Sequence, residues 1–408
     1  MNEIRLPQSR LEVLKFKLDA LLDITLQINA NQPTEVLLLK YESILRNYLG
    51  IGKVLLFIYR EKWEVLLNAG FNDDLKNNID VEQDLLLIKD IITDVPEGKL
   101  SGVDIIIPVF NNNAPLAYVL IGDIDEEGEG MSPVIKHLNY IQTISSIIVV
   151  AIENQRLFNE SLKQEAMRKE LEVAARMQMA LIPDNNRLPV NEHLKIQGFY
   201  NPHYEVGGDY YDFLRLDDNT IGFCIADVSG KGISAAMLMS NFQASLRALF
   251  TSTIDLGTLI IKLNEIINHN AAGEKFITFF VARIDRSSRR LEYVNAAHNP
   301  PVLINLENNE INHLAASCVG IGMLDEIPSI RKASVILPAA SKIICYTDGL
   351  SELKDQNGID IGTSYIEKHF TNKNDVRNNI KALIEDLDIS DNNPALFDDV
   401  SILAVEIL

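Results

Sequence analysis

The sequence predicts an α+β protein in which a long helix joins two mixed domains. Apolar residues recur at helical spacing over residues 11–28 and 36–49 and then give way to short Val, Ile and Leu runs. No proline or glycine interrupts residues 134–182, and short apolar runs with a few helical stretches follow. We therefore expect three parts: an N-terminal α+β domain over 10–130, a helical linker over 131–185 and a C-terminal domain over 190–408.

Composition limits the possible class of protein. The chain has 408 residues, 47% of them hydrophobic, which is enough for a core in each domain. Its net charge of −20 argues against a nucleic-acid partner, because phosphate backbones need clustered Lys and Arg. Three cysteines are too few for a disulfide framework and suit a reducing compartment. With no signal-peptide pattern and no apolar run of about 18 residues, we expect a cytoplasmic protein without a membrane span.

The N-terminal domain begins with the two helical stretches and continues as strands. Its apolar runs are 53–59, 63–67, 104–109 and 116–124. Asn111–Pro115 separates the last two runs and predicts a hairpin turn. Helices followed by a strand meander indicate a small α+β domain.

The linker pattern predicts a helix longer than usual for a globular domain. Its apolar residues keep a spacing of three or four at Leu138, Ile141, Ile144, Ile148 and Ile152. Such a run favours a coiled coil that pairs two copies of the chain in parallel, which predicts a homodimer. The alternative is a helix that packs on its own domain.

The C-terminal domain is predicted to be richer in strands. Its apolar runs are 221–226, 276–284, 291–296, 334–337, 343–346 and 400–407. Helical patterns cover 234–250, 258–268 and 376–387. Many strands with a few helices indicate stacked sheets covered by helices.

Four aspartates in this domain share one context, the edge of an apolar run beside glycine or another acid: Asp209, Asp227, Asp348 and Asp398. Gathered together, they would repel one another unless a cation neutralised them. Mg²⁺ and Mn²⁺ prefer such oxygen ligands, and two ions can activate water for phosphoryl transfer. Singly, each aspartate also fits a turn, a helix cap or a solvated loop.

The segment from Leu171 to Leu408 resembles the PPM-type (phosphatase 2C class) serine/threonine phosphatases in their bacterial SpoIIE-like branch. Five ordered blocks carry the resemblance: Glu205–Phe213, Ala226–Leu238, Asn295–Pro301, Tyr346–Leu350 and Asp398–Ser401. The resemblance implies a β-sandwich flanked by helices. It also implies a metal-dependent phosphatase acting on phosphoserine or phosphothreonine.

Family roles then transfer as implications. Asp227 is implied to bridge two Mn or Mg ions, with the Val228 carbonyl beside it. Asp209 is implied to bind one ion, and Asp348 and Asp398 the other. The second acid of the last pair, Asp399, fits the family pattern less well than the first. The implied partner is a phosphorylated regulatory protein, an anti-sigma-factor antagonist.

Two features depart from the wider family. Ser229 stands where eukaryotic members carry a histidine, and no arginine is obviously placed to bind substrate phosphate. Protonation of the leaving group therefore stays unassigned. His298 is expected to shape a turn. Gly230–Gly232 is no P-loop, because that motif needs a glycine five positions earlier and Ser or Thr after its lysine.

The N-terminal domain resembles a GAF domain in element order and in its place before a helical linker and phosphatase. Residues 1–136 contain no histidine or cysteine, which excludes histidine-ligated haem and a thioether-linked bilin there. Such a domain either binds an apolar metabolite or only dimerises, and the sequence leaves both open.

Regulation is expected to pass through the linker. Leu171–Pro183 resembles the segment that acts as a regulatory helix in this branch, although Met177, Met179, Leu181 and Ile182 also fit a plain core. Two rival functions remain: a non-catalytic dimeric scaffold that binds a regulator, and an enzyme acting on small phosphate esters.

Overall fold

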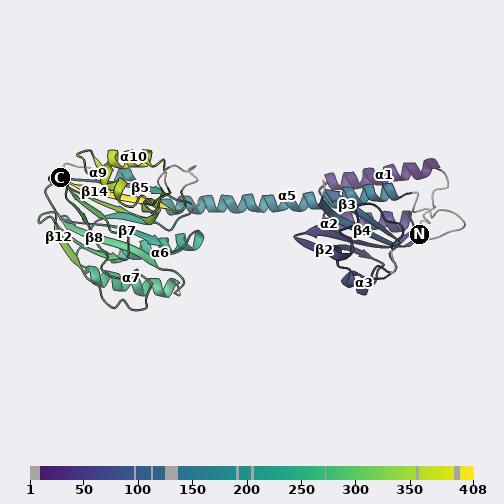
Figure 1. The fold of residues 1–408 in the computed structure, drawn as a ribbon, viewed down its shortest axis with the longest axis horizontal. Helices are drawn as coiled ribbons and strands as arrows, with labels where there is room; N and C mark the ends of the chain where they lie inside the picture. Colours follow the sequence, from purple (N-terminus) through teal and green to yellow (C-terminus); the bar gives the residue numbers. More distant parts are fainter. Residues whose placement is uncertain are drawn as a thin grey trace. The chain divides into compact units, whose positions relative to one another are not determined.

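The computed structural model describes residues 10–95, 98–111, 114–124, 137–189, 193–203, 206–271, 273–354, 358–389 and 396–408. Within these ranges the chain forms two compact units, Met1–Glu165 and Ala166–Leu408. Each unit combines β-sheet with covering helices (Figure 1). This confirms the predicted mixed α and β class.

The N-terminal unit is built on one antiparallel sheet of four strands in the order β2-β1-β4-β3. Its strands are β1 (Ile51–Arg60), β2 (Lys62–Ala69), β3 (Ile105–Asn111) and β4 (Ala114–Ile124). Its helices are α1 (Arg10–Asn29), α2 (Thr34–Ser43), the π-helical turn η1 (Ile44–Tyr48), α3 (Asp73–Asn78) and α4 (Val81–Asp84). In the predicted hairpin Asn111 pairs with Ala114, and residues 112 and 113 lie outside the described residues.

Both faces of this sheet are buried, which explains its nearly continuous apolar strands. Val54, Leu56 and Ile58 of β1 point into a core shared with α1, α2 and the start of α5. Leu55 and Phe57 point to the opposite face, where they pack with residues of the α3–α4 segment. The two-residue alternation of a strand therefore serves two cores.

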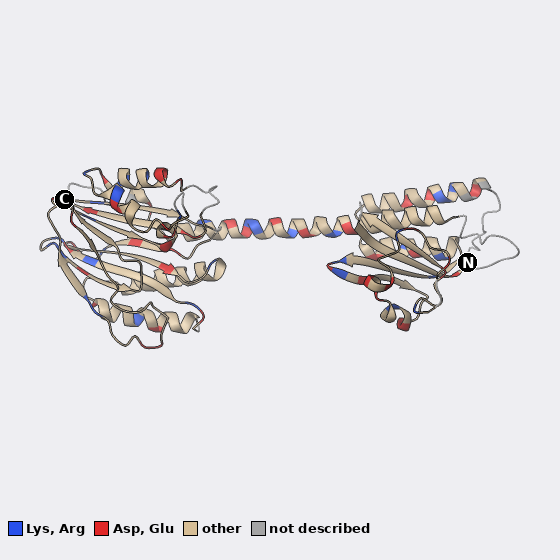
Figure 2. Ribbon diagram, in the orientation of Figure 1, with Lys and Arg blue, Asp and Glu red and all other residues tan. Residues whose placement is uncertain are grey.

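The predicted linker helix is a single helix, α5 (Leu138–Met179), of 42 residues. Its middle carries closely mixed acidic and basic side chains (Figure 2), among them Arg156, which contacts Glu153 and Glu160. Such pairs at a spacing of three or four stabilise a helix whose face is solvated. No helix in the described part of the chain has both the length and the apolar character that a membrane span needs.

The C-terminal unit contains two five-stranded sheets, β11-β10-β13-β14-β5 and β12-β9-β8-β7-β6. Its strands are β5 (Leu194–Asn201), β6 (Tyr210–Arg215), β7 (Thr220–Val228), β8 (Ile277–Asp285), β9 (Arg290–Ala296), β10 (Val302–Asn305), β11 (Ile311–His313), β12 (Ala333–Ile336), β13 (Ser341–Tyr346) and β14 (Val400–Ile407). Its helices are the turn η3 (Asn185–Arg187), α6 (Ile233–Leu249), α7 (Leu256–Ala271), α8 (Asp348–Ser351), α9 (Ser364–Phe370) and α10 (Val376–Asp386).

Alternation along β14 shows how the layers pack. Leu403, Val405 and Ile407 join the large core that includes residues of the other sheet, α6 and α7. Ile402 and Ala404 join a second core with residues of α9 and α10. A central pair of sheets with helices on the outside is the predicted sandwich.

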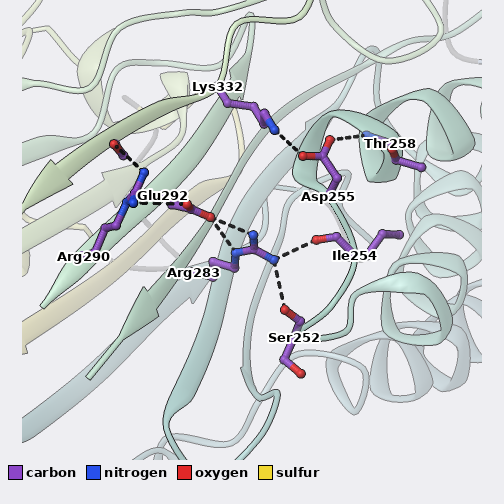
Figure 3. A network of polar contacts seen from close by, with 9 residues as sticks. Ser252, Ile254, Asp255, Thr258, Arg283, Arg290, Glu292 and Lys332 are labelled. Atoms are coloured by element: carbon purple, nitrogen blue, oxygen red, sulfur yellow. Dashed lines mark hydrogen bonds and ion pairs between the residues drawn. The ribbon is translucent and has the colours of Figure 1, made fainter. Parts of the chain in front are cut away.

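Polar contacts fasten the α6–α7 connection to the sheet (Figure 3). Arg283 of β8 donates to Glu292 of β9 at 2.7 and 2.9 Å and to the carbonyls of Ser252 and Ile254 at 3.2 and 2.7 Å. Asp255 accepts from the Thr258 amide at 3.2 Å, within the first turn of α7. These contacts hold the segment that leads into α7 against strands β8 and β9.

Candidate metal centre

The topology brings the four predicted aspartates to one end of the sandwich. Asp209 precedes β6, and Asp227 lies at the end of β7, which pairs with β6. Asp348 follows β13, and Asp398 precedes β14, which pairs with β13. Antiparallel neighbours place the start of one strand beside the end of the next, so each sheet contributes two acids.

Asp209 is the most buried of the four, with 1% of its surface exposed. The Thr347 hydroxyl donates to its carboxylate at 2.8 Å and accepts from the Ser401 amide at 2.9 Å. One hydroxyl therefore connects the acid before β6 with the ends of β13 and β14. Burial, followed by the charges of Asp227 and Asp399, raises the pKa of Asp209 well above its ordinary value.

Asp227 experiences the other acids most directly. Burial, then the charges of Asp348, Asp398 and Asp399, raise its pKa to about 7. Burial and the neighbouring Asp398 raise the pKa of Asp348 as well. In the fold, therefore, the charges of acids that are far apart in sequence act on one another.

The adjacent pair Asp398 and Asp399 divides into two roles. Asp399 is buried and accepts from the backbone amides of His203 and Gly208 at 2.8 and 2.7 Å. It thereby holds the loop that carries Asp209. The Asp398 side chain is 34% exposed and lies 2.9 Å from the Lys231 ammonium. Asp398 is therefore the more accessible acid of the pair, and its role as a metal ligand stays a prediction.

Two glycines permit the close approach of these loops. A Cβ atom on Gly349 would lie 2.0 Å from the Asp399 carbonyl oxygen. A Cβ atom on Gly208 would lie 2.9 Å from the Val228 carbonyl oxygen. Glycine at both positions therefore lets the backbone beside Asp209, Asp348 and the Val228 carbonyl come together.

Comparison with another buried acid tests whether these residues suit a cation. Asp212 is fully buried, but Arg247 donates to both of its oxygens at 2.7 and 2.9 Å. Asp209 and Asp227 have no Lys or Arg partner in the described part of the chain. Their charge is therefore uncompensated, and an all-oxygen donor set of this kind suits Mg²⁺ or Mn²⁺.

The side-chain positions do not form a finished ligand set. Within the described ranges, no three His, Cys, Asp or Glu side chains are arranged so that they could hold a metal ion together. The strands and loops bring the four acids to one end of the sandwich, but their side chains are not arranged as a ligand set. The assignment of individual ligands stays a prediction.

Gln178 is a contact residue that sequence reasoning missed. It lies near the end of α5, is 6% exposed, and forms two hydrogen bonds with Gly207. Its amide nitrogen donates to the Gly207 carbonyl at 2.5 Å, and its amide oxygen accepts from the Gly207 nitrogen at 3.1 Å. The end of the helix thus binds the backbone two residues before Asp209. No spacing signal distinguishes one glutamine in a charged helix.

His298 is buried, and its contacts are with a turn and with strand β8. Its backbone amide donates to the Asn295 side chain at 2.8 Å, which shapes the turn. Its ring nitrogen Nδ1 lies 2.8 Å from the Thr278 hydroxyl. Burial lowers the pKa of His298 to about 4, so the ring is neutral at pH 7.

Comparisons with known proteins match the C-terminal part of the chain. Residues 217–408 match the family described as Stage II sporulation protein E (SpoIIE), a range that includes Asp227, Asp348 and Asp398 but not Asp209. Phosphoserine phosphatase RsbU of Bacillus subtilis (strain 168) is 29% identical over 195 residues, covering 48% of this chain and 57% of its own length. Phosphoserine phosphatase RsbP of the same organism is 28% identical over 193 residues, covering 45% and 46%.

The solved structure of the SiaA-PP2C domain of Pseudomonas aeruginosa is similar with a TM-score of 0.51 and 20% identity. The match covers 59% of this chain and 97% of that domain. This chain spans about half the length of the curated relatives it matches. Together, the comparisons show that the C-terminal unit is similar in sequence to the SpoIIE family and has a fold like that of a PP2C domain.

Proposed function

We propose that the C-terminal unit, a SpoIIE-type domain with the PP2C fold, is a metal-dependent protein phosphatase. It removes phosphate from phosphoserine or phosphothreonine on a regulatory protein. The observation that carries this proposal is the group of acids at the sandwich end, where Asp209 is buried and Asp227 half-buried. Neither has a Lys or Arg partner among the described residues, and the pKa of each is raised. The names of RsbU and RsbP, both phosphoserine phosphatases, support the same reaction.

Two divalent ions, Mn or Mg, are proposed to bind Asp209, Asp227, Asp348, Asp398 and the Val228 carbonyl. Such ions lower the pKa of water and neutralise phosphoryl oxygens. The residues of this chain would position the ions. Asp227, whose pKa responds to Asp348, Asp398 and Asp399, is the proposed ligand shared by both ions. Thr347 and Asp399 hold Asp209 and its loop in place through the hydrogen bonds described above.

The proposed substrate class is a phosphorylated anti-sigma-factor antagonist. Its support is the family resemblance of the five motif blocks, and no residue contact identifies the partner. A rival enzyme for small phosphate esters would turn over metabolites and leave phosphoproteins untouched. Assaying both kinds of substrate with the same preparation separates the two functions.

Regulation is proposed to run from a GAF-like N-terminal sensor through α5. The contact that supports it is Gln178, whose amide binds the Gly207 backbone beside Asp209. We expect Gln178→Ala to change the Mn²⁺ concentration that gives half-maximal activity. Gln155, on the same helix, bonds only to Asn31 and Gln32 among its described contacts and offers a matched control. Equal Mn²⁺ dependence in Gln178→Ala and Gln155→Ala would remove this route of regulation.

A homodimer is proposed from the exposed apolar side chains of the N-terminal unit and α5. Leu11, Leu14, Leu18, Leu22 and Leu26 of α1 are each more than half exposed. Val150, Leu157, Phe158 and Leu162 continue an exposed apolar stripe along α5. A second copy of the chain would cover such faces. Leu18→Asp is expected to lower the mass measured by light scattering from dimer to monomer, and an unchanged dimer would reject this face.

Hydrolysis of para-nitrophenyl phosphate tests the proposed reaction. We expect Mn²⁺-dependent activity that EDTA removes and that Asp227→Asn lowers at least about a hundredfold, as when a transition-state electrostatic contributor is lost. Asp218→Asn makes the same chemical change at a fully exposed side chain and should have no effect. Activity that survives both EDTA and Asp227→Asn would contradict the mechanism. Absence of any Mn²⁺-dependent turnover would favour the non-catalytic scaffold.

A further inference from the structure

Lys231 is the basic side chain in contact with the acid cluster among the described residues. Its ammonium lies 2.9 Å from the Asp398 carboxylate and donates to the Phe397 carbonyl. Its positive charge also acts on Asp348, where it opposes the effect of burial. The Lys231 side chain is 39% exposed, so solvent and a ligand can reach it.

The loop that carries Lys231 is fixed on both sides of it. Gly230 and Gly232 have φ values of +81° and +77°, a conformation that other residues rarely adopt. Ser229, one residue earlier, is held by Lys275, which donates to its carbonyl at 2.9 Å, and by the Phe276 amide, which donates to its hydroxyl at 2.9 Å. The chain then enters α6 at Ile233. The position of Lys231 is therefore set by the backbone.

The pair formed by Lys231 and Asp398 is poorly explained as a structural staple. Both side chains are about one-third exposed, and ion pairs of that kind contribute little to stability. Among the described residues, Lys231 thus supplies an accessible positive charge at a cluster of acids that would otherwise repel a phosphate dianion.

We propose that Lys231, held against Asp398 at the edge of the acid cluster, binds the phosphoryl group of the substrate. This inference rests on the proposed function. An ammonium is a compact point charge with three donors, which suits the oxygens of a phosphate monoester. The sequence offered no arginine obviously placed to bind the substrate phosphate. Lys231 would supply that cationic contact instead. It acts on the substrate and need not hold the metal ions.

The test compares full-length wild type with Lys231→Met and Lys231→Arg. Inorganic phosphate serves as probe, both as an inhibitor of para-nitrophenyl phosphate hydrolysis and as a ligand in calorimetry with Mn²⁺ present. In Lys231→Met we expect the inhibition constant of phosphate and the KM for the ester to rise about tenfold, with a smaller change in kcat. Lys231→Arg keeps the charge and should retain phosphate affinity within about threefold.

Lys354 supplies the matched control, since its ammonium lies 2.8 Å from Asp360 in an exposed pair. Lys354→Met should leave phosphate affinity unchanged. Calorimetry of Mn²⁺ itself separates the two roles of Lys231. A Lys231→Met variant that binds phosphate like the wild type, while its Mn²⁺ affinity changes, would overturn the inference.

The experiments distinguish a failure of the proposed function from a failure of the inference about Lys231. If wild type and Asp227→Asn hydrolyse the ester equally, the phosphatase assignment fails and the inference falls with it. If Asp227→Asn is inactive but Lys231→Met keeps wild-type phosphate affinity, the phosphatase assignment stands and only Lys231 is reassigned.

Discussion

The two units of the chain bury very different side chains. Among the described residues of the N-terminal unit, the buried polar residue is Ser145, whose hydroxyl lies 2.5 Å from that of Tyr41. The C-terminal unit buries charged groups as well: Asp209, Asp212, Lys342, Asp399 and Glu406. Because buried charge is costly, its presence in only one of two well-packed units points to where the chemistry lies.

Within the C-terminal unit, the buried charges are again of two kinds. Asp212 is compensated by Arg247. Lys342 donates to the carbonyls of Asn372 and Asn374 and to the Asn379 side chain at 2.7 to 2.8 Å. Such groups fasten structure. Among the described residues Asp209 has no Lys or Arg partner, and a buried acid of that kind is the basis of the proposed cation site.

The largest expected effect breaks a compensated pair. Arg247→Met leaves the fully buried Asp212 carboxylate without its cation, and we expect the C-terminal unit to lose about 3 kcal/mol of unfolding free energy. Urea unfolding followed by a probe in that unit measures it. Arg215→Met removes a similar but exposed partner from Asp218 and should change nothing measurable. Equal losses in the two variants would contradict the distinction between paired and exposed acids.

The next effect concerns pH. His298 has an ordinary pKa of 6.5 in the unfolded chain and a pKa of about 4 in the fold, so the unfolded state binds the proton first. Its contribution is complete above pH 6.5 and falls as pH drops, by about 3 kcal/mol at pH 4. Unfolding of His298→Gln should therefore depend less steeply on pH between 6.5 and 4 than that of the wild type. Identical pH slopes would contradict a buried neutral ring.

Neutralising a buried acid without a Lys or Arg partner should raise stability, whereas removing the partner of Asp212 lowers it. Asp209→Asn removes a buried acid that has no Lys or Arg partner in the described part of the chain. The amide oxygen of the new side chain can still accept from Thr347. In EDTA we expect the variant to be about 1 kcal/mol more stable than the wild type. Added Mn²⁺ should raise the unfolding free energy of the wild type more than that of the variant. Destabilisation in EDTA would show that Asp209 is structurally compensated after all.

The smallest effect lies in the N-terminal unit. Ser145→Ala removes the partner of the buried Tyr41 hydroxyl, at an expected cost of about 1 kcal/mol in that unit. Thr143, on the same helix, bonds only to the Asn139 carbonyl at an exposed position and provides the control. Thermal unfolding of the two variants compares them. A neutral Ser145→Ala would mean that the hydroxyl pair adds nothing to this core.

Sequence patterns predicted the helices and strands whose buried residues recur at a single helical or strand spacing. The predicted helix over 376–387 is α10 (Val376–Asp386), and the run 400–407 is β14. Strand β6 (Tyr210–Arg215) was missed because buried Asp212 interrupts its apolar run, and only the distant Arg247 makes that acid tolerable. The short helices α3 and α4 were missed for lack of a repeating apolar face.

The acids of the candidate site could be predicted from the sequence, but the residues that hold them in place could not. Asp209, Asp227, Asp348 and Asp398 each carry a local signal, and the fold brings them to one end of the sandwich. The separate roles of Asp398 and Asp399 depend on amides of residues about 190 positions away in sequence, such as Gly208. Contacts of that kind leave no local pattern, which is also why Gln178 escaped notice.

Direct measurement of Mn²⁺ binding tests the central claim, that uncompensated acids from four segments form a cation site. Calorimetry should show Mn²⁺ binding to the wild type and to Asp218→Asn with equal affinity, and at least tenfold weaker binding to Asp227→Asn. If Asp227→Asn binds Mn²⁺ as tightly as the wild type, or if the wild type does not bind it at all, the acids do not form the proposed centre.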